Sequence, residues 1–285
     1  MTENVKNEIN TENYDKDNKN NNSESNILEE GDIYFFYRPK KNSSEVKDID
    51  DIRRFFMVTS SEKRFGKKNN DGKRQAQMFR LFVIGKKSLP EIRKSEARAS
   101  ERYWARVGGI FDNLDDLTND LFSDEFRKGD AARPVGAGKY IIVKHQNHAE
   151  IAYVLETPEK PGEAQEELGI EKEASFIISV INPKNPAPQG FPSNEESPKY
   201  PDKVLEEFDE SQNFVSLGKD TSLIDYINTQ VILIGAREGK DVIKRDLGID
   251  IDDDGKVNKE SDVIKKLRLQ NQNVPTKPLT EGKLA

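Results

Sequence analysis

The chain has 285 residues, of which 34% are hydrophobic and 34% are charged, with a formal net charge of −7 and no cysteine. The lack of cysteine excludes disulfides, thiolate metal sites and cysteine nucleophiles. No apolar run reaches the roughly 18 residues of a membrane-spanning helix, and the polar, acidic N-terminus lacks the apolar stretch of a signal peptide, so we expect a cytoplasmic protein with no membrane partner.

Polar residues dominate both ends of the chain. Residues 1–30 are mostly Asn, Asp, Glu, Lys and Ser, and residues 270–285 are similar. Segments of this composition cannot bury enough apolar surface to offset the entropy of ordering, so both are predicted to be disordered tails. The folded region is expected over 31–240, either as one domain or as two lobes, 31–125 and 126–240.

Apolar segments in the first half of the folded region have the composition of buried strands. Their β-branched and aromatic residues suit a pleated, buried surface, and glycine or proline interrupts the chain near their ends. Strands are therefore predicted at 33–37, 55–59 and 79–84. The stretch at 61–77 has turn chemistry and no apolar periodicity, so an exposed loop is expected there.

Two helices are predicted after these strands. Ser88 can cap free amides and Pro90 fits a first turn, which indicates a helix from about 90 to 107. Apolar residues recur at helical spacing toward its end, at Tyr103, Trp104, Val107 and Ile110. Trp104 is accordingly expected to be a core residue. The second helix is predicted at 114–122, where leucines and a phenylalanine share one face.

The second half returns to the periodicity of strands. Strands are predicted at 139–144, 149–155, 175–181 and 230–234, with a short helix between Pro161 and Gly169. The proline-rich segment 182–201 excludes a central strand or helix and is expected to be an extended surface excursion. Together these elements predict an α+β fold, with mainly antiparallel sheets in two halves and a few packed helices.

Several segments, in order along the chain, resemble an uncharacterised family of archaeal and bacterial proteins. The segments that carry the resemblance are GDIYFFYRP at 31–39, RFFMV at 54–58, ERYW at 101–104, AARP at 131–134, EASF at 173–176 and NP at 182–183. The resemblance covers about 31–240 and implies a real folded unit, but it implies no activity, ligand or partner. The loop at 61–77 and the segment beyond Lys240 depart from the family pattern.

Basic residues are concentrated between Asp51 and Arg106, where 16 Lys and Arg stand against six Asp and Glu. One interpretation is a surface for a polyanion or a nucleic acid. Its candidate residues are Arg53, Arg54, Lys63, Arg64, Lys67, Lys68, Lys73 and Arg74. The alternative is that much of the excess charge is merely solvated in the loop at 61–77, because no aromatic residues for base stacking are interleaved with it.

An acidic loop with flanking helices is predicted at 241–269, and its residues 250–261 resemble the calcium loop of EF-hand and dockerin modules. Calcium is bound by several carboxylate and carbonyl oxygens at alternate positions of such a loop, with a glycine at the turn. The candidate Ca²⁺ ligands are Asp250, Asp252, Asp254 and Asn258. Position 12 holds Ser261 instead of the usual bidentate glutamate, so the alternative is an acidic turn that leads into a solvated tail.

The two histidines of the chain, His145 and His148, flank Gln146-Asn147. This dipeptide is typical of a two-residue hairpin turn, which would place both imidazoles on one face of the hairpin. Glu150, two residues further along the strand, points to the same face. Such a pair could hold a transition metal ion, although spacing alone determines no third ligand. The alternative is a hairpin tip whose histidines are only exposed.

No Gly-x-Ser-x-Gly elbow is present, and no carboxylate pair can be singled out among the 52 acidic residues. The preferred hypothesis is therefore a non-catalytic intracellular binding or interaction protein, with another protein or a polyanion as partner. A nucleic-acid-binding module that uses the basic region 51–106 is one alternative. A metal-dependent enzyme centred on His145 and His148 is the other, and Ca²⁺ is the candidate cofactor of the acidic loop.

Overall fold

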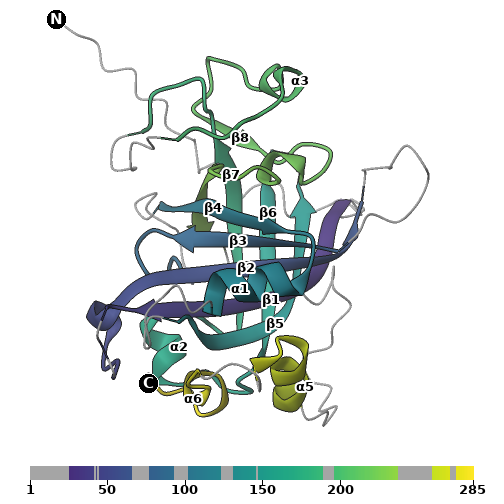
Figure 1. The fold of residues 1–285 in the computed structure, drawn as a ribbon. Helices are drawn as coiled ribbons and strands as arrows, with labels where there is room; N and C mark the ends of the chain where they lie inside the picture. Colours follow the sequence, from purple (N-terminus) through teal and green to yellow (C-terminus); the bar gives the residue numbers. More distant parts are fainter. Residues whose placement is uncertain are drawn as a thin grey trace, which may run out of the picture.

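The computed structural model describes most of the region that the sequence analysis expects to fold (Figure 1). The described residues are 26–41, 43, 45–65, 77–92, 102–122, 131–145, 147–188, 196–236, 259–269 and 274–285. Most of the predicted N-terminal tail, most of the loop at 61–77 and the candidate calcium ligands lie outside these ranges.

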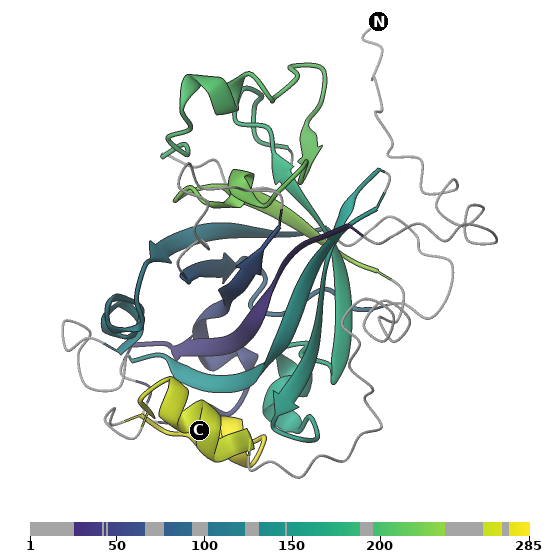
Figure 2. The ribbon, with the colours of Figure 1, turned by 90° about the vertical axis from the view of Figure 1, so that its right-hand side faces the viewer.

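In the described part of the chain, nine strands form one antiparallel sheet. The strands are β1 (Asn26–Pro39), β2 (Ile52–Arg64), β3 (Met78–Ile84), β4 (Tyr103–Phe111), β5 (Arg133–Lys144), β6 (Ala149–Thr157), β7 (Glu173–Ile181), β8 (Phe214–Ser216) and β9 (Gln230–Gly235). They are hydrogen-bonded in the order β6-β5-β1-β2-β3-β4-β9-β7-β8. Because β6 also pairs with β7, eight strands close into a barrel, and β8 extends β7 outside it (Figures 1 and 2).

The prediction of an α+β fold with sheets in two halves is wrong, because the fold is mainly β and its strands form one barrel. Strands from both halves of the sequence are neighbours: β1 pairs with β5 as well as β2, and β4 pairs with β9. The helices are α1 (Leu114–Phe122), α2 (Glu163–Glu167), α3 (Asp202–Leu205), α5 (Lys259–Lys266) and α6 (Lys277–Thr280), with short 3-10 turns η2 (Ile49–Asp51) and η3 (Ser222–Ile224). Within the described ranges, none of these helices has the length and apolar character needed to cross a membrane.

The helix predicted at 90–107 is wrong at its end, where the chain forms the strand β4. Ala105 and Val107 are fully buried, and they alternate with the half-buried Trp104 and Arg106. This alternation is the period of a strand. The apolar residues of this segment fit the period of a helix as well as that of a strand. Backbone pairing with β3 on one side and with β9 on the other favours the strand.

The barrel interior is packed with aromatic side chains. Phe35, Phe55, Tyr153 and Phe176 are fully buried, and the ring centroids of Phe35 and Tyr153 lie 5.2 Å apart in an edge-to-face arrangement. Outside the barrel, α1 forms where it was predicted and buries Leu117, Leu121 and Phe122 against the sheet. A side-chain core therefore fills the barrel, and a second apolar layer lies between the sheet and α1.

Different segments cover the two ends of the barrel. We call the end at which β5 leads into β6 the hairpin end, and the end at which β5 begins the α6 end. At the hairpin end, the connection 217–229 places Leu217, Leu223 and Ile224 in the core. At the α6 end, α6 packs against β5 (Figure 1).

Both termini of the described chain contribute more to the core than their composition predicts. Leu28 and Glu29, inside the predicted tail 1–30, are buried residues of β1. Residues 270–285 are predicted to be disordered, whereas Leu279 of α6 is fully buried. The side-chain amide of Gln165 in α2 donates hydrogen bonds to the carbonyls of Val135 and Pro278, at 2.6 and 2.8 Å, and so ties α6 to β5.

The single tryptophan of the chain provides a test of this packing. A Cβ on Gly85 would lie 2.2 Å from Trp104 Cε2, whereas a Cβ on Gly218 would meet nothing within 4 Å. We expect Gly85→Ala to lower the free energy of unfolding by about 1–3 kcal/mol, because the indole ring must move. Gly218→Ala, the control, should leave stability nearly unchanged. Chemical denaturation followed by Trp104 fluorescence measures both, and equal stabilities of the two variants would contradict the packing described.

Candidate functional site

The β5–β6 hairpin brings the two histidines together, as the sequence predicts. The backbone N–H of His145 donates to the carbonyl of His148 at 2.8 Å, which closes the turn. Next to this turn, Ala149 pairs with Lys144 and is buried in the core. One position further along the ladder, Glu150 pairs with Val143. Because side chains alternate along each strand, the two imidazoles and the Glu150 carboxylate share the outer face of the hairpin.

The three side chains form a compact group of possible metal ligands. The imidazole centroids are 5.0 Å apart. The Oε1 atom of Glu150 lies 2.8 Å from His148 Nε2 and 3.8 Å from His145 Nε2. One ligand atom from each residue falls within 4.8 Å of the other two. In a tetrahedral site with bonds of about 2.0–2.1 Å, ligand atoms are roughly 3.4 Å apart, so the observed separations are close to those of a metal centre.

The surroundings of this group favour ion binding. The side chains of His145, His148 and Glu150 are 28%, 16% and 13% exposed, so each is partly shielded from water but still reachable. Val143 on β5 and Ile177 on β7 lie directly opposite Glu150 on the two neighbouring strands. An apolar flank lowers the local dielectric and strengthens the attraction between a carboxylate and a cation. Imidazole nitrogen and carboxylate oxygen are common ligands of Zn²⁺ and of other divalent transition metals.

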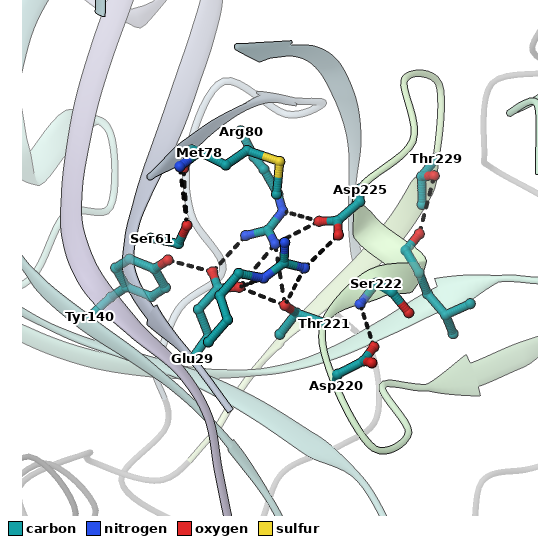
Figure 3. A network of polar contacts seen from close by, with 12 residues as sticks. Glu29, Ser61, Met78, Arg80, Tyr140, Asp220, Thr221, Ser222, Asp225 and Thr229 are labelled. Carbon is teal, nitrogen blue, oxygen red and sulfur yellow. Dashed lines mark hydrogen bonds and ion pairs between the residues drawn. The ribbon is translucent and has the colours of Figure 1, made fainter. Parts of the chain in front are cut away.

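A second polar group, which the sequence analysis missed, lies inside the barrel at the hairpin end (Figure 3). Glu29 on β1 is fully buried and accepts a hydrogen bond from Arg80 Nη2 on β3 at 2.9 Å. The hydroxyls of Tyr140 on β5 and of Thr221 in the connection 217–229 donate to the same carboxylate. Three strands and one connection therefore meet at a single side chain. No local sequence signal marks Glu29, because its partners lie 51, 111 and 192 positions away.

A second carboxylate and a second guanidinium complete this network. Asp225 Oδ1 accepts from Arg80 at Nε and Nη2, at 2.8 and 2.6 Å. Arg64 pairs with Asp225 through Nη2 and approaches Glu29 with Nε at 3.2 Å. Two carboxylates and two guanidinium groups balance, so the buried network carries no net charge.

Charge and hydrogen bonding explain the protonation states of the network. Burial alone raises the pKa of Glu29, but the Arg80 charge and the hydrogen bonds from Arg80, Thr221 and Tyr140 outweigh burial, so the pKa lies below its usual value. Burial and the Glu29 charge raise the pKa of Tyr140 well above the ordinary range, so this phenol stays protonated and donates. An ionised Glu29 that accepts from several donors has a structural role and is not placed to act as a general base.

The candidate polyanion-binding residues do not gather on one surface in the part of the chain that the structure describes. Arg53 and Arg54 are exposed where β2 begins, while Lys63 pairs with Glu30 where it ends. At about 3.3 Å per residue, Arg54 and Lys63 are roughly 30 Å apart. The side chain of Arg64 is turned into the barrel and is 3% exposed, so its assignment to an exposed basic surface does not hold. The remaining candidates, Lys67, Lys68, Lys73 and Arg74, lie outside the described residues.

The candidate calcium ligands, Asp250, Asp252, Asp254 and Asn258, also lie outside the described residues, so the calcium loop stays a prediction. α5 begins at Lys259, close to the position where the second flanking helix is predicted.

Comparison with known proteins assigns no family: no protein-family model, curated protein or solved structure matches the chain. The resemblance to a family of archaeal and bacterial proteins therefore stays a prediction.

The buried network can be tested by replacing one carboxylate. Glu29→Gln keeps the shape of the side chain but leaves an uncompensated positive charge inside the barrel, so we expect the free energy of unfolding at neutral pH to fall by about 3–5 kcal/mol. Glu30→Gln, one residue along, removes an ion pair with the exposed Lys63 and should change it by about 0–1 kcal/mol. Urea denaturation of both variants measures these differences. Similar losses in the two variants would contradict the role assigned to Glu29.

The loss of stability caused by Glu29→Gln is also expected to depend on pH. The pKa of Glu29 is lower in the folded than in the unfolded chain, so the unfolded chain binds more protons in the interval between the two values. The stability that ionised Glu29 contributes is fully present above about pH 4.5, its ordinary pKa, and is lost as pH falls through the folded-state pKa. The stability difference between the wild type and Glu29→Gln should therefore narrow below that pH. A difference that stays constant down to pH 3 would count against an ionised Glu29.

Proposed function

We propose that this chain is a non-catalytic binding protein that holds a divalent transition metal ion, with Zn²⁺ as the best-fitting choice, on the β5–β6 hairpin. The observation that carries the proposal is the convergence of one ring nitrogen of His145, one ring nitrogen of His148 and a Glu150 carboxylate oxygen within 4.8 Å of one another. Three donors of these types are common in protein zinc sites.

The position of the ligands in the fold also supports the proposal. The three residues come from one hairpin whose strands are part of the closed barrel, so the backbone that carries them is held by the ladders to β1 and β7. Little further ordering is required when an ion binds, and preorganisation of this kind raises affinity. Two neutral imidazoles and one carboxylate leave a bound divalent ion with one net positive charge.

A metal-dependent enzyme is the second candidate, because three protein ligands leave one position of a tetrahedral ion open to water, as in many catalytic zinc sites. Against it, Glu150 supplies the one carboxylate of the cluster and would be used as a ligand, so the described cluster keeps no general base. The cluster also lies on the outer, convex face of the barrel, where a substrate would be only partly enclosed.

Metal binding can be measured directly on protein purified without a histidine tag. We expect calorimetric titration with Zn²⁺ to show one site per chain, and Co²⁺ to give the visible absorption of a tetrahedral centre. His145→Ala, His148→Ala and Glu150→Gln should each weaken binding by roughly tenfold or more, since even residues behind the ligands contribute about that much. Asn147→Ala, at the exposed turn between the histidines, is the matched control and should bind like the wild type. Unchanged stoichiometry in the double variant His145→Ala, His148→Ala would refute the site.

Hydrolysis of p-nitrophenyl acetate separates the two candidates once binding is established. For a non-catalytic protein, the Zn²⁺-loaded and metal-free chains should hydrolyse this ester at the same rate. A faster rate with Zn²⁺ that disappears in His148→Ala would favour the enzyme.

A further inference from the structure

The Glu150 carboxylate of the metal cluster lies in a row of aliphatic side chains that crosses five strands. Directly paired positions on neighbouring strands project to the same face of a sheet, so the members of the row share the outer face of the barrel. In order across β1, β5, β6, β7 and β9 they are Ile27, Val143, Glu150, Ile177 and Ile234. We call these five residues the aliphatic row, and Glu150 is its one polar member.

One side of the aliphatic row is accessible from solvent next to Glu150. Val143 is fully buried and separates Glu150 from Ile27, whereas Ile177 and Ile234, on the other side, are both partly exposed. At a spacing of about 4.8 Å between strands, these two isoleucines stand roughly 5 and 10 Å from the Glu150 backbone. An apolar surface therefore begins beside the metal ligands and leads away from them across β7 and β9.

A metal ion at this cluster needs a ligand from outside the group. His145, His148 and Glu150 supply three of the four ligands of a tetrahedral ion, and no further His, Asp or Glu joins them among the described residues. The chain has no cysteine and no third histidine. With two neutral imidazoles and one carboxylate, a bound divalent ion keeps one net positive charge. The apolar flank strengthens its attraction for an opposite charge, so an anionic oxygen fits the open position best.

We propose that the metal centre binds an aliphatic carboxylate, an unbranched fatty acid of short or medium chain length. Its carboxylate takes the open position of the ion, and its alkyl chain lies over Ile177 and Ile234. This inference rests on the proposed metal binding at the β5–β6 hairpin. The carboxylate neutralises the remaining charge of the ion, and the two isoleucines remove methylene groups of the ligand from water.

The two halves of this site predict a joint requirement. A small anion such as acetate is held by the ion but is too short to gain from the aliphatic row. An alkyl chain without the metal has only a flat, partly exposed apolar surface to bind. Tight binding therefore needs a carboxylate and an alkyl chain in one molecule, together with a loaded metal site.

The experiment uses the full chain, purified without a histidine tag and loaded with equimolar Co²⁺. Sodium acetate, butyrate, hexanoate and octanoate are titrated at matched ionic strength, and the visible absorption of the Co²⁺ centre reports changes in its ligands. We expect a saturable shift with each carboxylate and an affinity that rises by at least roughly tenfold from acetate to octanoate, because each methylene removed from water adds to binding. Calorimetry should show that the metal-free chain binds octanoate at least roughly tenfold more weakly.

Variants locate the alkyl chain of the ligand. Ile177→Thr and Ile234→Thr keep a β-branched side chain that suits a strand. Each should weaken octanoate binding severalfold while acetate and Co²⁺ bind as in the wild type. Ile227→Thr is the matched control, because it changes a 51% exposed isoleucine of the connection 217–229, outside the aliphatic row. This control should leave the affinities for octanoate, acetate and Co²⁺ unchanged.

The outcomes distinguish this proposal from the metal binding on which it rests. A wild type that binds no Co²⁺ refutes the metal site, and the carboxylate site with it. A wild type that binds Co²⁺ without a spectral response to any carboxylate overturns the carboxylate site alone. Equal affinities for acetate and octanoate, or octanoate binding that does not need the metal, overturn it as well. The chain-length series on the wild type decides the matter even where a variant does not fold.

Discussion

The Glu29 carboxylate is the contact on which the closed barrel depends. It joins β1 to Arg80 on β3 and Tyr140 on β5, and through Thr221 to the connection 217–229 that covers the hairpin end. Arg64 and Asp225 bring the total charge to zero, which makes so polar a group tolerable in the interior. The connection 217–229 is thereby fastened to the barrel by buried ionic contacts in addition to its apolar packing.

Several strands could be predicted from the sequence, because their apolar residues are neighbours along the chain and need no distant contact to be recognised. Examples are 55–59, 79–84 and 175–181. The closure of these strands into one barrel could not be predicted, because pairings such as β4 with β9 join residues well over a hundred positions apart. The sequence predicts a helix in place of β4 for a related reason. Its apolar residues satisfy helical and strand spacing alike, and only its neighbours in space distinguish the two.

The candidate sites also differ in whether local sequence or distant contacts determine them. The hairpin with His145, His148 and Glu150 is determined by a two-residue turn, so the sequence alone placed these side chains on one face. The role of Glu29 could not be predicted, because this residue belongs to a polar stretch that has the composition of a disordered tail.

Closure of the sheet also limits how another protein could bind. In the described part of the chain, eight strands are paired on both sides, and the three-residue β8 is the one strand that lies outside the ring. A partner that recognises proteins by adding its own strand needs a free backbone edge of some length. Association with this barrel would therefore proceed through side chains and connecting loops. The same closure protects its long apolar strands from pairing between chains, the first step of ordered aggregation.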